Sequence, residues 1–436
     1  MTTRASHGGL AISFAIAVIA CLAASPALAQ AAKIDPADTA WMISATGLVL
    51  MMTVPGLALF YAGMVRKKNV LATMAQSFAA VMLGSVLWLA VGYSLAFSGD
   101  GPVIGTLNRV FLQGVGMDTA HPAAATIPEA LFMIYQMTFA VITVALVAGS
   151  VADRMRFSAF LWFAAGWLLL VYVPLAHWVW GGGFLGAAGL LDFAGGTVVH
   201  LNAGVAGLVA ALILGPRKGY GTDNFAPYDL SLAVIGTGLL WVGWFGFNGG
   251  SALGANSRAV FAMVATHLAA CAGALAWMFL EWWTRGKPSV LGMISGVVAG
   301  LGTITPASGF VLPWHGLVIG LIAGTVCFWA CTKLKQQLGY DDSLDVFGVH
   351  GVGGFTGTLL TGVFAAGAIS GGPTGLLEGN PGQVLTQAYG VAVTIVWAGV
   401  VTWALLKVID LFVPLRVSSQ NEVEGLDISQ HGEALQ

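Results

Sequence analysis

Two matching stretches decide the fold: Asp192-Phe-Ala-Gly-Gly-Thr-Val-Val-His200 and, 150 residues later, Asp342-Ser-Leu-Asp-Val-Phe-Gly-Val-His350. Each has Val directly before the His and a glycine four and seven residues after it, so both read D-x6-V-H-x3-G-x2-G. Histidine occurs only 8 times in the 436 residues, so a chance match of this kind is not expected. We interpret the two stretches as copies of an internal repeat.

The composition around these stretches is that of an integral membrane protein. Only 8% of the residues are charged and 57% are hydrophobic, whereas roughly a quarter of the residues in soluble domains are charged. A soluble fold cannot hide that much apolar surface. The composition therefore excludes a soluble enzyme and a disordered chain, and the net charge of −2 gives no reason to expect a nucleic-acid partner.

Apolar runs long enough to cross a bilayer follow one another with short, charged connections. We predict eleven transmembrane helices, at about 39–65, 70–97, 127–150, 158–180, 197–214, 229–249, 259–283, 289–307, 314–332, 346–368 and 386–412.

Lys and Arg predict the orientation. If the mature N-terminus lies outside, thirteen of the 17 fall in cytoplasmic segments, while Lys33, Arg109 and Arg258 fall outside and Arg4 lies in the leader. Because positive residues concentrate on the cytoplasmic side, we predict a multi-pass protein of the inner membrane with its N-terminus outside. The tail, 413–436, lies in the cytoplasm and is too short for a catalytic or output domain.

The repeat and the orientation together define the architecture. One copy of the motif begins the fifth span and the other the tenth, so the copies run in opposite directions. We predict an all-α inverted repeat of five plus five helices, about 39–214 and 229–368, with an extra helix at 386–412. Such folds place their functional site at the repeat interface near the midplane. We therefore expect His200 and His350 to meet there, with the glycine-rich segment 181–196 lining a vestibule.

The first 29 residues have the pattern of a removable signal peptide. Arg4 precedes an apolar stretch, and Ala27-Leu28-Ala29 forms a cleavage site. The competing interpretation is a weak lipoprotein box that ends at Cys21. The remaining cysteines lie inside apolar runs, so we predict no disulfide framework.

The paired histidines permit a specific chemistry. A charged group within the membrane costs about 3 kcal/mol or more, so buried imidazoles are expected to be neutral. Two neutral rings can share one N–H and pass a proton along a pore. Asp192 and Asp342 each precede a helix, where a carboxylate caps free N–H groups. A negative charge at that point would also attract a cation, and both interpretations stay open.

With these features in view, the chain resembles the ammonium transporters of the Amt/MEP/Rh family, in particular the bacterial Amt branch. The resemblance extends from about residue 40 to 433. Besides the two stretches quoted above, it rests on Pro55-Gly-Leu-Ala-Leu-Phe-Tyr-Ala-Gly63, Ala152-Asp-Arg-Met-Arg-Phe-Ser158, Ala176-His-Trp-Val-Trp-Gly-Gly-Gly183, Gly243-Trp-Phe-Gly-Phe-Asn248, Glu424-Gly-Leu-Asp427 and His431-Gly432-Glu433.

The resemblance implies an ammonium-conducting domain over residues 30–412 and a homotrimer with one pore in each subunit. It also implies roles for individual residues. The expected outer recruitment site comprises Trp167, Ser251, Phe139 and Asp192, the stacked pore gate comprises Phe139 and Phe247, and the twin histidines at the midplane are His200 and His350. One point conflicts with this transfer: counted from Arg156 at about 1.5 Å per residue, Trp167 lies about 16 Å along its helix, which is mid-membrane.

The function that the resemblance implies is uptake of ammonium, which loses a proton and crosses as ammonia. Methylammonium is the expected analogue, and a PII-type regulatory protein is the implied cytoplasmic partner. The alternatives are an ammonium sensor that signals through a partner with little transport, and a channel for small neutral solutes. The sequence contains no metal, nucleotide or flavin motif, so we expect no cofactor and no enzymatic activity.

Overall fold

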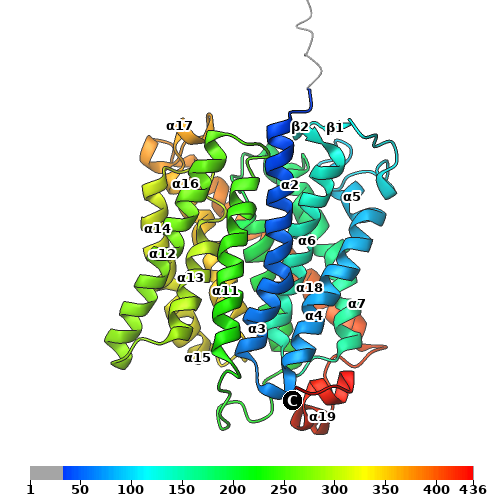
Figure 1. The fold of residues 1–436 in the computed structure, drawn as a ribbon, viewed down its shortest axis with the longest axis vertical. Helices are drawn as coiled ribbons and strands as arrows, with labels where there is room; N and C mark the ends of the chain where they lie inside the picture. Colours follow the sequence, from blue (N-terminus) through cyan, green and yellow to red (C-terminus); the bar gives the residue numbers. More distant parts are fainter. Residues whose placement is uncertain (1–32, 436) are drawn as a thin grey trace, which may run out of the picture.

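The computed structural model describes residues 33–435 as a bundle of helices that stand side by side (Figure 1). One end, called here the hairpin end, carries β1 (Ala120–His121), β2 (Ala124–Pro128) and α17 (Gly367–Ser370). The opposite end, called the tail end, carries α19 (Ser419–Glu424) and the C-terminus. The predicted signal peptide and Cys21 fall outside the described residues.

Nine helices within residues 33–435 are long and apolar enough to cross a membrane. The two other predicted spans correspond to the shorter helix Val290–Ile304 and to the consecutive helices Phe347–Gly351 and Val352–Phe364. All eleven predicted apolar segments are thus helical, which confirms the all-α polytopic membrane protein, while the number of crossings and the orientation stay predictions. The nine helices are Pro36–Met64, Lys67–Phe97, Glu129–Val151, Phe157–Ala187, Gly196–Leu214, Leu230–Gly249, Ser257–Arg285, Pro313–Leu338 and Gly382–Asp410.

Several of these helices change from α-helical to π-helical winding along their length, and the sites described below lie close to such changes. The first half of the chain contains α2 (Pro36–Met51), η1 (Met52–Leu57), α3 (Ala58–Met64), η2 (Lys67–Asn69), α4 (Val70–Leu87), η3 (Trp88–Gly92), α5 (Tyr93–Phe97), η4 (Val110–Leu112), α6 (Glu129–Val151), α7 (Phe157–Trp167), η5 (Leu168–Tyr172), α8 (Val173–Trp180), α9 (Phe184–Ala187), η6 (Gly196–Leu201) and α10 (Asn202–Leu214).

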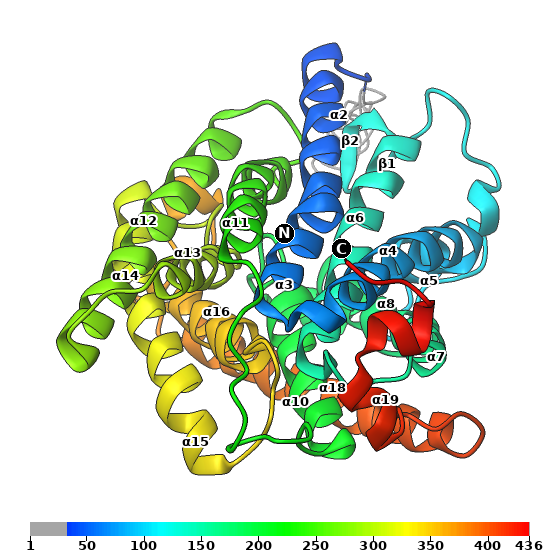
Figure 2. The ribbon, with the colours of Figure 1, turned by 60° about the horizontal axis from the view of Figure 1, so that its bottom comes forward.

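The second half begins at α11, and its helices α12, α13 and α14 lie together at one side of the bundle (Figure 2). It contains α11 (Leu230–Trp244), η7 (Phe245–Gly249), α12 (Ser257–Arg285), α13 (Val290–Ile304), α14 (Pro313–Trp329), η8 (Ala330–Leu334), α15 (Lys335–Leu338), η9 (Phe347–Gly351), α16 (Val352–Phe364), α17, η10 (Leu376–Glu378), α18 (Gly382–Asp410), α19 and η11 (Asp427–His431).

The repeated glycines explain how the two copies of the motif meet. A Cβ on Gly204 would lie 2.2 Å from the backbone of Gly351, and one on Gly354 would lie 2.6 Å from the carbonyl oxygen of Gly196. Each copy therefore needs its glycine so that its helix can touch the histidine-bearing segment of the other copy. Close backbone approach through small residues is the usual way in which helices pack in membranes.

The two copies run in opposite directions, as predicted for an inverted repeat. Helix α10 ends at Leu214, whose carbonyl accepts a hydrogen bond from Arg416 of the tail (2.9 Å). Helix α16 instead leads to α17 at the hairpin end (Figure 1). The segments before His200 and His350 consequently approach the middle of the bundle from opposite ends.

The tail folds back onto the bundle. The carboxylate of Asp427 accepts hydrogen bonds from the backbone N–H groups of Leu71 (3.1 Å) and Ala72 (2.8 Å) in the first turn of α4. The backbone N–H of Leu426 donates to the side chain of Asn69 (2.8 Å). The tail thereby satisfies helix donors that would otherwise lack a partner.

Candidate functional site

The two repeated histidines meet in the interior. His200 on η6 and His350 on η9 have their Nδ1 atoms 3.2 Å apart, and their rings lie 5.2 Å apart at an angle of 13°. Both are buried, with exposed fractions of 1% and 4%. In a hydrogen bond between two neutral rings one nitrogen donates and the other accepts, so the pair shares a single proton along this contact.

Aromatic rings stack on the pair toward the hairpin end. The His200 ring lies over Trp244 at 5.5 Å and 17°, and it lies 6.2 Å from Phe247. Phe247 stacks on Phe139 at 4.1 Å and 24°, and both phenylalanines are fully buried. The structure thus brings together the two rings predicted to form a gate, directly beside the histidines.

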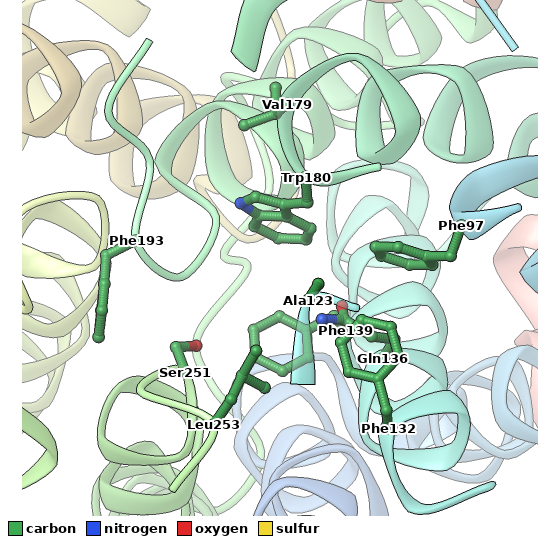
Figure 3. A pocket seen from close by; sticks show the side chains of 10 residues that line it. All are labelled: Phe97, Ala123, Phe132, Gln136, Phe139, Val179, Trp180, Phe193, Ser251 and Leu253. Atoms are coloured by element: carbon green, nitrogen blue, oxygen red, sulfur yellow. The ribbon is translucent and has the colours of Figure 1, made fainter. Parts of the chain in front are cut away.

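A pocket of about 280 Å³ lies beyond this stack, and we call it the hairpin-end pocket. In Figure 3 the Trp180 ring, the Phe139 ring and the Ser251 hydroxyl surround one hollow. The Ser251 hydroxyl donates to the carbonyl of Phe247 (2.8 Å) and lies 3.4 Å from the Tyr135 hydroxyl, and its oxygen can still accept a further hydrogen bond. The ten lining residues, none of them charged, are Phe97, Ala123, Phe132, Gln136, Phe139, Val179, Trp180, Phe193, Ser251 and Leu253.

Trp167 is not part of this pocket, and its predicted place at the outer site is wrong. It is fully buried, and its indole N–H donates to the hydroxyl of Thr402 on α18 (3.0 Å). Trp167 lies in the middle of the long helix Phe157–Ala187, as the rise per residue from Arg156 had indicated. The tryptophan that lines the pocket is Trp180, which sequence reasoning missed although it ends a span just before three glycines.

Asp192 caps a helix and is not among the residues that line the pocket, in contrast to its predicted recruitment role. One carboxylate oxygen accepts from the N–H groups of Gly195 (2.7 Å) and Gly196 (2.6 Å). The other accepts from the backbone N–H of Thr197 (2.8 Å) and of Val198 (3.2 Å), and also from the Thr197 hydroxyl. The carboxylate is therefore fully used in starting η6, the segment that carries His200.

A second hollow, of about 160 Å³, opens from His350 toward the tail end. Its lining includes Tyr61, Asp345 and Phe225. Phe225 belongs to the loop 215–228, and its ring lies close to two guanidinium groups, 4.7 Å from that of Arg66 and 4.4 Å from that of Arg217. Tyr61 and Asp345 lie in stretches of sequence quoted above, but neither was predicted to line a hollow, and Phe225 carries no repeat or spacing signal.

Buried ion pairs hold this end together. Arg217 binds Asp341 (2.7 Å) and also lies 3.5 Å from Asp153, and Arg66 binds Asp153 (3.0 Å). Burial on its own raises the pKa of Asp341, but the hydrogen bonds and positive charge of Arg217 outweigh that effect and lower the pKa below its usual value. The carboxylate is thus expected to be ionised at neutral pH.

The comparison with known proteins agrees with this geometry. The Ammonium Transporter Family matches residues 40–435. The ammonium transporter of Aquifex aeolicus is 50% identical over 425 residues, covering 96% of this chain and 97% of that protein. The ammonium transporter of Bacillus subtilis is 49% identical over 397 residues, covering 91% and 97%.

Solved structures show the same fold. The crystal structure of Saccharomyces cerevisiae Mep2 matches with a TM-score of 0.83 at 38% identity, covering 89% of this chain and 88% of that one. A structure described as a sensor Amt protein matches with a TM-score of 0.84 at 28% identity, covering 91% and 98%. The chain described here therefore belongs to the ammonium transporter family of membrane proteins.

Proposed function

We propose that this protein takes up ammonium from outside the inner membrane and passes it through each subunit as ammonia. The proposal rests on one observation: a pocket, a ring stack, the histidine pair and a second hollow follow one another through the interior of the bundle. The hairpin-end pocket adjoins the Phe139–Phe247 stack, the stack adjoins His200, and His350 lines the hollow that opens toward the tail end.

Recruitment is assigned to Trp180 and Ser251, with Phe139 at the base of the pocket. Ring faces attract ammonium-like cations because their quadrupole is negative above the ring. The Ser251 oxygen can accept an N–H of the cation while its own hydrogen stays bonded to Phe247. Trp180 thus takes the role that was expected of Trp167.

Selectivity is assigned to loss of a proton. Below the stack the surroundings are apolar, and an intact ion would be costly there. Ammonium can give up a proton and continue as a neutral molecule, whereas potassium has no proton to give. The buried Nε2 of His200 has no hydrogen-bond partner within the described residues, so it is free to bond to a polar molecule that passes. The proton either returns outside or crosses separately.

The direct test uses purified protein in proteoliposomes, with pulses of ammonium, methylammonium and potassium. We expect an ammonium-dependent signal and none from potassium. A current means that net charge crosses, and a rise in lumenal pH without current means that only ammonia crosses. Neither signal, with ammonium binding intact, would contradict transport and favour a sensor; an equal response to unrelated neutral solutes would favour a general solute channel.

We propose the orientation and a regulatory contact from the charges at the tail end. Arg66, Arg217 and Arg416 gather there beside the loop 215–228 and the tail, and positive residues favour the cytoplasmic side. The hairpin end then faces outward. The hollow, the loop and the tail form the surface on which a PII-type protein would close the pore.

We also propose a homotrimer. The outer surface formed by α2, α11 and α12 exposes large apolar residues, including Ile43 and Ile235, together with Gly47 and Gly238. His267 lies exposed in the same region, with its ring 5.4 Å from that of Trp241. An ionisable side chain midway along a membrane helix is expected to face protein and not lipid, so a neighbouring subunit fits this surface.

A further inference from the structure

The β1–β2 hairpin forms part of the wall of the hairpin-end pocket. Ala123, in the turn between its strands, lines that pocket. The hairpin is held away from its turn, because Asp35 donates its N–H to the carbonyl of Thr126 in β2 (2.8 Å) and Glu129 donates its N–H to the carbonyl of Thr119 at the open end (2.6 Å). Its position therefore affects the shape of the pocket.

His121 in this hairpin makes three contacts, and each reaches a residue that lines the pocket. Its Nε2 lies 2.8 Å from the carbonyl oxygen of Phe97. Its Nδ1 lies 3.1 Å from the backbone nitrogen of Ala123. Its ring stacks on Phe132 at 4.6 Å and 14°. One side chain thus connects α5, the hairpin and α6 behind the wall of the pocket.

These partners fix the state of the imidazole. A backbone N–H can only donate, so Nδ1 must accept from Ala123; a carbonyl oxygen can only accept, so Nε2 must carry the hydrogen bonded to Phe97. Both contacts are satisfied by one neutral tautomer. A protonated ring would place a second N–H against that of Ala123, and this contact would be lost.

We propose that neutral His121 is a positioning residue of the recruitment pocket, and that its protonation weakens recruitment of ammonium at acid pH. The inference rests on the proposed function of that pocket. Protonation would lower the affinity of the pocket for ammonium in two ways. It breaks the hydrogen bond that holds Ala123 in the wall of the pocket, and it adds a positive charge close to a pocket that is to attract a cation.

Charged groups lie close to His121. His121 lines a neighbouring hollow together with Asp100, Arg109 and Glu129. Arg109 binds Glu129 (3.1 Å), which also accepts from the Tyr93 hydroxyl (3.0 Å). The test compares transport at pH 7.5 and at pH 5.5, because histidine side chains in general change charge between these values.

The experiment measures the ammonium concentration that half-saturates transport in proteoliposomes. His121→Ala removes all three contacts. His121→Asn keeps an acceptor for the N–H two residues on, as in an Asx turn, but it cannot become charged. Met117→Gln, at a residue of the same loop that is 91% exposed, is the matched control.

At pH 7.5 we expect His121→Ala to raise the half-saturating concentration about threefold to tenfold, the range that loss of a hydrogen bond allows. The maximal rate should stay within about twofold, and Met117→Gln should resemble the wild type. From pH 7.5 to pH 5.5 the wild-type value should rise relative to that of His121→Asn. Wild-type values for His121→Ala at both pH values, or an equal rise in His121→Asn, would overturn the proposal.

A Trp180→Ala arm separates this inference from the proposed function. If Trp180→Ala also leaves the half-saturating concentration unchanged, the pocket does not recruit ammonium and the proposed function fails at that step. If Trp180→Ala raises it while His121→Ala does not, only the positioning role of His121 fails.

Discussion

At the scale of single residues, Trp180 and Trp167 lie on one long helix but differ in surroundings. Trp180 lines the hairpin-end pocket, whereas Trp167 is fully buried and bonded to Thr402. The pair therefore forms a matched test of recruitment, since both changes remove an indole from the same helix.

We predict that Trp180→Ala raises the half-saturating ammonium concentration about twofold to thirtyfold, because a cation–π contact contributes about 0.5 to 2 kcal/mol. Trp167→Ala should leave that concentration unchanged but lower the free energy of unfolding by about 3 to 5 kcal/mol, the cost of emptying a buried site. Transport assays and thermal unfolding measure the two effects. If Trp167→Ala raised the half-saturating concentration more than Trp180→Ala does, Trp167 and not Trp180 would be the tryptophan that recruits ammonium.

The same residues show how far the sequence could predict the site. His200 and His350 were predictable because the repeat marks both and the symmetry places them together. Ser251 and Phe139 line one pocket and Phe139 stacks on Phe247, while the roles that the resemblance implies for them stay predictions. Trp167 was misplaced because the role taken from the family was preferred over the position counted along the helix. That count had already placed Trp167 in the middle of the membrane.

At the scale of elements, the start of η6 depends on one side chain. Asp192 accepts hydrogen bonds from four consecutive backbone N–H groups, Gly195 to Val198. We predict that Asp192→Ala lowers the free energy of unfolding by about 1 to 3 kcal/mol, because buried donors lose their acceptor. Asp229→Ala, which removes a single contact to Ser231 in an exposed cap, should have a smaller effect in the same thermal-unfolding measurement. Equal effects would contradict the capping account.

The ion pairs at the tail end predict a pH dependence. Because the pKa of Asp341 is lowered in the folded protein, the pair with Arg217 stabilises the fold above the ordinary carboxyl pKa of about 3.9, and this stabilisation is lost as pH falls through the lower folded value. The melting temperature should thus drop as pH falls below about 4, where the carboxyl group of the unfolded chain becomes protonated first. In Asp341→Asn the melting temperature should be low already at pH 7, because loss of the buried partner of Arg217 lowers the free energy of unfolding by about 3 to 5 kcal/mol.

The control for that change is Asp223→Asn, at an exposed position of the loop 215–228. It should melt like the wild type at every pH. A wild-type melting curve for Asp341→Asn at pH 7 would contradict the stabilising role of the pair. None of these pairings could be predicted from the sequence, because the partners lie on segments far apart in the chain and follow no periodic pattern.

At the scale of the whole molecule, the eleven predicted apolar segments are all helical because length and composition alone define them. Details that depend on tertiary packing were not predictable: the depth at which η6 and η9 begin, the switches in helix winding and the return of the tail to α4. The repeated glycines were visible in the sequence, but their purpose becomes clear only where Gly204 meets Gly351.

The proposed trimer is tested by a bulky residue on the shared surface. A Cβ at Gly238 would meet no atom within 4 Å in the single subunit, so Gly238→Phe should fold but obstruct a neighbouring subunit. We predict loss of the trimer in native mass spectrometry for Gly238→Phe and an intact trimer for Val400→Phe, at a 60% exposed position on α18. A monomeric wild type, or an unaffected trimer in Gly238→Phe, would contradict the assignment.

The histidine pair is the central claim, and its most direct test compares ammonium and potassium in proteoliposomes for His200→Ala, His350→Ala and the control Val400→Ala, at a 60% exposed position on α18. The contact between the two Nδ1 atoms predicts that each pair variant loses most of the ammonium flux or begins to admit potassium, while Val400→Ala keeps wild-type behaviour. Unchanged flux and unchanged selectivity in both pair variants would contradict the account.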